Sequence, residues 1–211
     1  MDAGVVGRDQ VQHILDEVWR HNLSGLGYYV LDVGQVDSRT LREKMVEIKY
    51  EFSQFNEFGF KSLSRFDQQE TTRFHQDAGP DFNILMLGYE PTNIKSRIFI
   101  ADHSCAANDI RVSPSELLIE AMLGNDERIL PYVTELPQPL PGHSFILIIN
   151  NSNSPVGLGV LHKAIIDTPN DNEKRIINSI MLNLGKDEVG VGRRHEFLTT
   201  DEISQKYEKN I

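Results

Sequence analysis

The residues of this chain best suited to carry chemistry are two histidines and one carboxylate. His75 and Asp77 are two positions apart, and on a β-strand this spacing directs both side chains to the same face. His162, far along the chain, offers a third donor from a second predicted strand. Two histidines and one carboxylate around a metal leave half of an octahedron open, which is the ligand set used by non-haem Fe(II) in oxygen chemistry. We therefore interpret these three residues as candidate ligands of one divalent metal.

A His-x-Asp spacing often occurs by chance and is weak evidence on its own. The order of predicted elements after His162 supports the interpretation more strongly. Residues 158–167 predict a strand, and the sequence Asn-Asp-Asn-Glu-Lys at 170–174 predicts a polar turn. An apolar run that opens on Arg175 then predicts a second strand. In this order of elements, the chain resembles the 2-oxoglutarate/Fe(II)-dependent oxygenase superfamily over roughly residues 26 to 184.

The resemblance implies a role for each of these residues. His75, Asp77 and His162 would bind Fe(II), and a basic residue about a dozen positions after the distal histidine would pair with the far carboxylate of 2-oxoglutarate. Here that residue is Arg175, whose planar guanidinium suits bidentate carboxylate binding. A common version of the family pattern has Ser or Thr two residues after the Arg. This chain has Ile177 there and its nearest hydroxyl at Ser179, so the second contact to the carboxylate is left open.

The reaction that the resemblance implies is hydroxylation of an unactivated C–H bond, with consumption of O2 and release of succinate and CO2. A carboxylate at Asp77, where related halogenases have a small residue, predicts hydroxylation or desaturation and no chlorination. With 211 residues the chain has little room for long lids, so we expect a small substrate such as an amino acid or a natural-product intermediate. Two alternatives share the ligands: a cupin-like metal-binding or sensing module without turnover, and a non-haem iron enzyme that does not use 2-oxoglutarate.

Inward-facing neighbours of the proposed ligands are further candidates. Arg73 shares strand parity with the ligands at 75 and 77 and is expected to point toward the same interior. Asn83 and Tyr89 lie on one face of the next predicted strand, and Arg97 lies on the strand after that. We interpret Asn83 and Tyr89 as candidate contacts for 2-oxoglutarate, and Arg73 and Arg97 as candidate contacts for the substrate. His143 lies where a turn enters a strand, and we interpret it as structural.

Short strands form the framework that must position these residues. Eight segments bounded by turn signals have strand character, at 61–66, 71–77, 82–89, 96–101, 128–134, 144–150, 158–167 and 175–184. Amphipathic helices are predicted at 9–20 and from Asp37 to Phe52, on either side of a short strand at 27–31. Capping-box patterns predict a helix at 113–123 and a short C-terminal helix that opens at 199–202. We predict a mainly β fold, a double-stranded β-helix (jelly roll) with flanking α-helices, with the ligands at one mouth of the barrel.

Composition sets the remaining expectations. We expect a single domain over residues 1–211, and no run of 18 apolar residues predicts a membrane span. The N-terminal residues lack the pattern of a secretory signal, and a lone Cys105 fits a reducing, cytoplasmic setting. The net charge of −10 argues against a nucleic-acid partner, because phosphates would be repelled. A small molecule is the expected partner, and the sequence does not define an oligomeric state.

Overall fold

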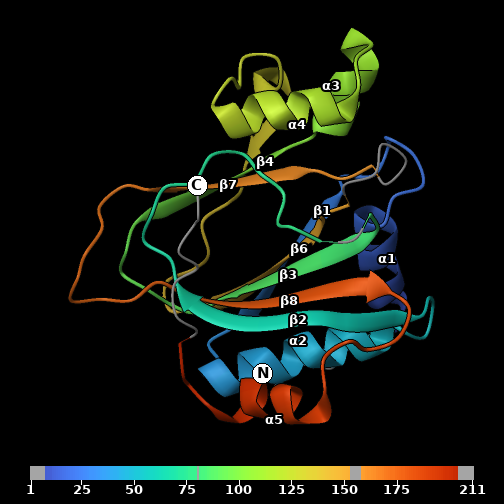
Figure 1. The fold of residues 1–211 in the computed structure, drawn as a ribbon. Helices are drawn as coiled ribbons and strands as arrows, with labels where there is room; N and C mark the ends of the chain where they lie inside the picture. The colour runs from blue at the N-terminus through green and yellow to red at the C-terminus, as the bar shows by residue number, and fades with distance from the viewer. Residues whose placement is uncertain (1–7, 80, 153–157, 204–211) are drawn as a thin grey trace.

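The computed structural model describes residues 8–79, 81–152 and 158–203 and is built around two antiparallel sheets (Figure 1). The larger sheet has five strands in the order β1 (Tyr28–Gly34), β6 (Ser144–Asn150), β3 (Asn83–Tyr89), β8 (Ile176–Leu184) and β2 (Phe58–Asp67). The smaller sheet has three strands in the order β5 (Val133–Glu135), β4 (Ser96–Ala101) and β7 (Leu161–Ile166). The prediction of a mainly β fold with flanking helices is confirmed at this level.

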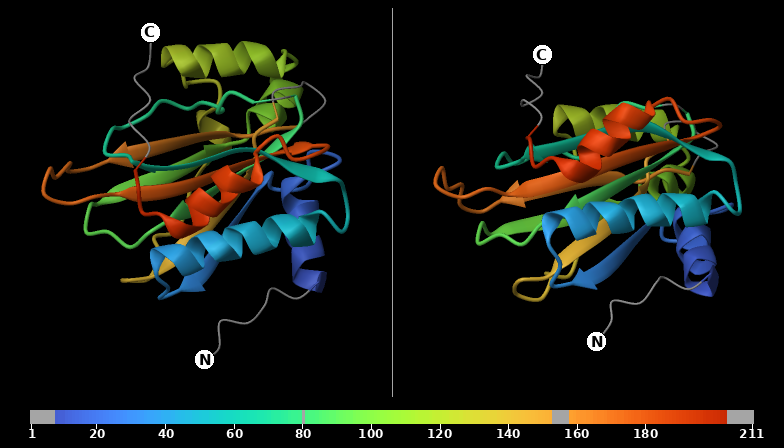
Figure 2. Two further views of the ribbon diagram at one scale, coloured as in Figure 1. Left: turned by 60° about the horizontal axis from the view of Figure 1, so that its bottom comes forward. Right: turned by 90° about the horizontal axis from the view of Figure 1, so that it is seen from below.

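Helices cover the outer face of each sheet. The outer face of the larger sheet packs against α1 (Arg8–Val18), α2 (Ser38–Phe52) and α5 (Val191–Thr199), through a cluster that includes Ile14, Met45, Ile84 and Ile148 (Figure 2). The smaller sheet carries α3 (His103–Ile110) and α4 (Pro114–Leu123) on its far side. None of the described helices is long and apolar enough to cross a membrane.

The space between the sheets is filled by side chains of alternate strand residues. On β3, Leu85, Leu87 and Tyr89 belong to this inner cluster, whereas Ile84 and Met86 pack outward against the helices. This is the alternation expected of a strand that is buried on both faces. Asn83 has the same parity, so the inner face of β3 runs from Asn83 at one end to Tyr89 at the other.

Most predicted elements are present with small shifts of their ends. The helices expected at 9–20, 37–52 and 113–123 correspond to α1, α2 and α4. The strand expected at 27–31 is β1, and those expected at 61–66, 82–89, 96–101, 144–150, 158–167 and 175–184 are β2, β3, β4, β6, β7 and β8.

The strand predicted at 71–77 is wrong. The segment lies antiparallel beside β7 but forms only one isolated bridge, between His75 and His162. Nearby, the hydroxyls of Thr71 and Thr72 accept hydrogen bonds from the backbone N–H groups of Ile166 and Ala164, each at 3.0 Å. Side-chain oxygens therefore take places that backbone carbonyls would occupy in a regular ladder.

Two further predictions needed correction. The strand predicted at 128–134 begins as a 3-10 helix, η1 (Leu130–Tyr132), because Pro131 has a fixed φ and no N–H to donate, and only the short β5 follows it. The C-terminal helix predicted to open at Thr199 does not open there, since α5 ends at Thr199 and Thr200 is extended. The residues after 203, over which most of that helix would run, lie outside the described residues. The helices α3 and α5 were not predicted. The helix α5 begins after Gly190, which makes no side-chain capping bond, so the sequence carries no start signal.

Candidate metal centre

The two candidate histidine ligands are placed by a direct pairing of their backbones. The N–H of His75 donates to the carbonyl of His162 at 3.1 Å, and the N–H of His162 donates to the carbonyl of His75 at 3.0 Å. Residues paired in this way across an antiparallel bridge project their side chains to the same face. The two imidazole centroids accordingly lie 4.2 Å apart.

Asp77 completes a three-residue cluster. One ligand atom from each of His75, Asp77 and His162 lies within 4.8 Å of the other two, and His75 Nε2 is 3.7 Å from Asp77 Oδ1. Donors that share one ion at about 2.1 Å lie at most about 4.2 Å apart, so the cluster is close to the spacing of a shared ion. His75 Nδ1 lies 2.8 Å from the carbonyl oxygen of Arg73, which orients the ring and leaves Nε2 for the cluster.

The electrostatics of His162 suit a metal ligand. Its pKa is lowered to about 4, mainly by burial and also by the neighbouring His75, while the carboxylate of Asp77 opposes both effects. His162 is therefore neutral near pH 7, the form in which imidazole binds a metal. Its Nδ1 is buried and has no hydrogen-bond partner among the described residues.

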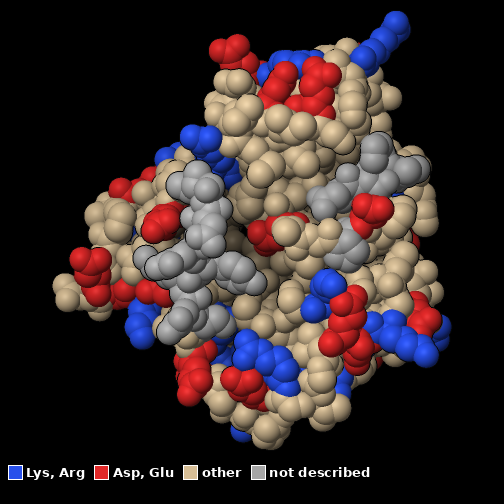
Figure 3. Space-filling model, viewed as in Figure 1, with Lys and Arg blue, Asp and Glu red and all other residues tan. Residues whose placement is uncertain are grey.

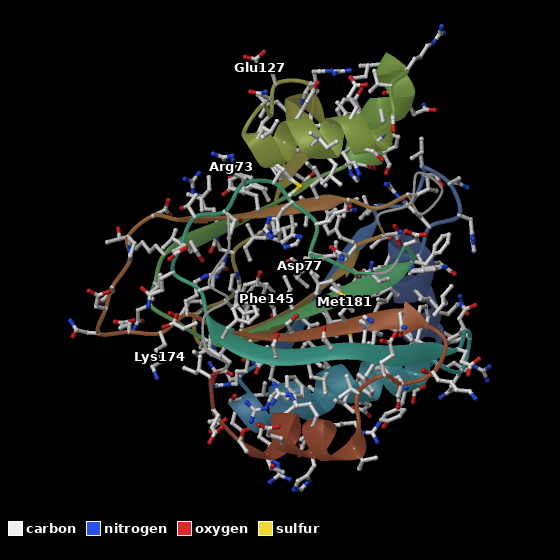
Figure 4. The ribbon with its side chains drawn as sticks, viewed as in Figure 1. Arg73, Asp77, Glu127, Phe145, Lys174 and Met181 are labelled. Carbon is white, nitrogen blue, oxygen red and sulfur yellow. The ribbon has the colours of Figure 1, made fainter. Side chains whose placement is uncertain are left out.

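The cluster opens at a hollow of the surface between the two sheets. In Figure 4, Asp77 lies above Met181 and Phe145, in the space between the two sheets. The space-filling view from the same side shows an acidic side chain within this hollow, with uncharged residues above and below it (Figure 3). The carboxylate of Asp77 is part-exposed, at 42%, while the His162 side chain behind it is buried. The open side of the cluster therefore faces the solvent-accessible hollow.

Arg175 lies at the other end of the inner face, immediately before β8, and is 2% exposed. Its Nε donates to Ser96 Oγ at 3.0 Å and its Nη1 donates to Gln68 Oε1 at 2.6 Å, both neutral acceptors. Its Nη2 is buried without a partner, and no ion pair of Arg175 occurs within the described part of the chain. The charge of Asp67 acts on Arg175 only from beyond ion-pair distance. A buried guanidinium without a direct ion pair is costly, so this position is suited to receive an anion.

Tyr89 connects Arg175 to the metal cluster. Its ring lies under the guanidinium, 5.1 Å from Arg175 Cζ, and stacks on Phe145 at a centroid separation of 4.5 Å. Burial raises the pKa of Tyr89, the charge of Arg175 lowers it, and the charge of Asp77 raises it. The phenol thus lies within electrostatic range of both the guanidinium and the metal cluster.

The other candidate residues lie elsewhere. Asn83 is at the metal end of β3, but its side-chain amide is engaged with Asn151 at 2.7 and 3.0 Å. The expected inward direction of Arg73 is wrong: Arg73 donates to the carbonyl of Met122 in α4, because residues 71–77 do not keep strand alternation. Arg97 points outward and pairs with Asp167 at 3.1 Å, since Ile98 and Ile100 take the inner face of β4.

His143, which was interpreted as structural, lies 2.9 Å from Asp32 and contributes nothing to the cluster. A cavity of about 410 Å³ opens at the end of the sandwich opposite the cluster, between the β3–β4 and β5–β6 loops. Tyr89 and Arg175 line this cavity, so the guanidinium lies between the inner face and a second opening.

Sequence reasoning missed Asn151, a fully buried residue whose side chain contacts the backbone of Asp77. It belongs to a polar run with no strand or helix period, and nothing in the sequence indicates that the run lies beside residue 77. No protein-family model matches this chain, and no curated protein is significantly similar to it.

Proposed function

We propose that this protein is a non-haem Fe(II)- and 2-oxoglutarate-dependent oxygenase that hydroxylates a small molecule. The observation that carries the proposal is the combination of two features on one inner face. A His-Asp-His cluster lies at the open end, and a buried guanidinium that makes no ion pair within the described residues lies at the other end. Each feature alone has simpler explanations, but together they provide a metal site and an anion site between the same two sheets.

The donor set fits Fe(II). Neutral imidazoles and a carboxylate suit a divalent first-row metal, and three protein ligands leave positions for a co-substrate and O2. Bound there, iron would supply the redox chemistry with O2, while the chain holds the ligands and orients the reactants. The unpartnered Nδ1 of buried His162 and the open side of the cluster both support occupation of this site.

Arg175 fits the distal carboxylate of 2-oxoglutarate. Ser96, which bonds to Arg175, pairs with Ile166, whereas Ile100 pairs with the candidate ligand His162. The anion site and the metal cluster are therefore four strand positions apart, which is about 13 Å of backbone. The side chains of Arg175 and of the candidate ligands shorten this distance. Arg175 Nη2 would hold the carboxylate, and the hydroxyl of Tyr89 is a second donor for it, at a place where the chain lacks the expected Ser or Thr.

The strand order supports a double-stranded β-helix as the architecture. From β2 onward, successive segments fall in the two sheets as β2, then 71–75, β3, β4, β5, β6, β7 and β8. In one sheet the neighbours follow the order β2, β8, β3, β6. In the other they follow the order segment 71–75, β7, β4, β5, when the irregular segment 71–75 is counted as a strand. These are the neighbours that two interleaved four-stranded sheets of a jelly roll require.

The remaining parts of the proposal follow from the chemistry. Fe(II) is kept reduced most easily in a reducing compartment, and the lone Cys105 is compatible with one, so we place the protein in the cytoplasm. The described residues above and below the hollow at the cluster are mainly uncharged, which suits a small uncharged or weakly charged molecule. The net charge of −10 disfavours a nucleic-acid partner, and we propose no membrane partner.

The test is turnover of 2-oxoglutarate. Purified protein with Fe(II) and ascorbate should release labelled CO2 and succinate from 1-labelled 2-oxoglutarate, slowly alone and faster with a substrate found by screening amino acids and metabolites. The Asp77→Ala variant should show neither release nor stimulation. Metal binding without any succinate would favour a cupin-like module. O2 uptake with a substrate but without 2-oxoglutarate would favour an iron enzyme that does not use this co-substrate.

A further inference from the structure

The backbone of Asp77 is held by a single side chain. Asp77 lies outside every strand of the structure, and no other backbone group of the described residues bonds to its N–H or carbonyl. Instead, its N–H donates to Asn151 Oδ1 at 3.0 Å, and its carbonyl accepts from Asn151 Nδ2 at 2.9 Å. The carboxamide of Asn151 therefore contacts Asp77 in the way a peptide group of an adjacent strand would.

The carboxamide of Asn151 is itself oriented by a second asparagine. Asn151 Nδ2 donates to Asn83 Oδ1 at 2.7 Å, and Asn83 Nδ2 donates to the carbonyl of Asn151 at 3.0 Å. Both residues are buried, at 0% exposed. Because the donor and acceptor ends of the Asn151 amide are both used, the group has one favourable orientation.

The residues beside Asp77 and Asn151 are also bonded to each other. Gln76 Nε2 donates to the carbonyl of Ser152 at 2.8 Å. At Gly159, a Cβ would lie 2.4 Å from the Ser152 carbonyl oxygen and 2.5 Å from Gln76 Nε2. The close approach of the three segments therefore requires glycine at this position.

The three candidate ligands are fixed in different ways. His75 and His162 hold each other through their backbone bridge, but that bridge does not include Asp77. The Asp77 carboxylate is short, so its position is set mainly by its backbone, and the backbone groups of Asp77 are bonded to Asn151. We infer that Asn151, oriented by Asn83, is the residue that positions Asp77 as a metal ligand.

This inference rests on the proposed metal centre, and the experiment separates the two. Co(II) or Mn(II) is titrated into metal-free protein, and unfolding of the metal-free protein by urea is measured in parallel. Asn151→Ala should weaken metal binding by about tenfold or more, in the range found when residues that orient ligands are removed. Asn83→Ala should weaken it less, because the two bonds from Asn151 to Asp77 can persist.

Asn178→Ala is the matched control. Asn178 is equally buried, at 0% exposed, and its amide bonds to Glu90 Oε1 at 2.9 Å, on the outward side of β8 away from the cluster. This variant should lose stability to a similar extent and keep its metal affinity within about twofold, since its contacts do not include a ligand.

A double-mutant cycle decides whether Asn151 acts through Asp77. If it does, Asn151→Ala should cost no further metal affinity in an Asp77→Ala background, and the weak absorption bands of bound Co(II) should change in the same direction in both single variants. Additive losses, or unchanged affinity in Asn151→Ala when Asp77→Ala binds poorly, would overturn the inference and leave the metal centre standing. Wild-type protein that binds neither metal would overturn both.

Discussion

His75 and His162 exchange both of their backbone hydrogen bonds, at 3.1 and 3.0 Å, in the one isolated bridge of the described residues. The spacing of the two rings is therefore set by the backbone and does not depend on side-chain packing alone. A metal added to such a site meets donors that are already ordered, so little conformational entropy is lost on binding. This relationship leads to the first prediction.

Alanine at His75, Asp77 or His162 should weaken the binding of one divalent ion per chain by about tenfold or more, because each substitution removes a donor of the same ion. The measurement is metal content after reconstitution and dialysis, together with a Mn(II) titration. His143→Ala is the control, since His143 contacts Asp32 at the far end of the sandwich and should leave binding unchanged. Full metal loading of His162→Ala would refute the assignment.

Arg175→Gln should raise the 2-oxoglutarate concentration needed for half-maximal CO2 release by about tenfold or more, since loss of a charge-assisted contact costs a few kcal/mol. The affinity for Fe(II) or Mn(II) should hardly change, because Arg175 is not a donor. Arg97→Gln is the matched control, as its guanidinium is part-exposed and already paired with Asp167. An unchanged requirement in Arg175→Gln would remove this residue from the proposal and favour a ligand that enters by the cavity beyond it.

The parts of the fold that could be predicted were those with a regular hydrophobic period. Strand β3 alternates between the inner and outer clusters, and helix α4 has Pro114 near its start and Gly124 after its end, so both were located from sequence. Segment 71–77 has the composition of a strand, but the hydroxyls of Thr71 and Thr72 take the place of backbone carbonyls in part of its pairing with β7, and no sequence period indicates this.

The sequence indicated the three candidate metal ligands but not the residue that positions one of them. His75, Asp77 and His162 could be proposed because their types and order are restrictive. The direction of Arg73 could not, because parity holds only for a regular strand, and Arg73 instead donates to the Met122 carbonyl. The role of Asn151 depends on a contact between segments 74 residues apart, which only the folded chain defines.

The buried ion pair between Arg20 and Asp102 should be a main determinant of stability beside the site. Arg20 is 5% exposed, donates twice to the Asp102 carboxylate at 2.6 and 2.8 Å, and donates through Nε to the carbonyl of Leu158, close to strand β7. Arg20→Ala should lower the free energy of unfolding by about 3 kcal/mol or more, because it leaves a largely buried carboxylate unpaired.

Urea unfolding measures this effect, and Arg97→Ala provides the comparison. The Arg97–Asp167 pair is part-exposed, so its loss should cost less than about 1 kcal/mol. The double variant Arg20→Ala/Asp102→Ala should lose less than the sum of the two single variants, because the pair is then removed together. Equal effects of Arg20→Ala and Arg97→Ala would show that burial does not strengthen the Arg20 pair.

His103 should make the metal-free protein less stable in mild acid. Burial lowers its pKa to about 4, Asp102 opposes this effect and Arg20 adds to it, whereas an unfolded histidine titrates near 6.5. Between these values the unfolded chain binds the proton and the folded chain does not, so stability is full above about pH 6.5 and falls as the pH drops toward 4. The slope for one such histidine is about 1.4 kcal/mol per pH unit, and His162 contributes a second slope of the same sign.

His103→Leu should therefore remove about 2 kcal/mol of the loss in unfolding free energy between pH 7 and pH 5, measured in urea with a chelator present. An undiminished slope in His103→Leu would mean that His103 is not held neutral in the fold.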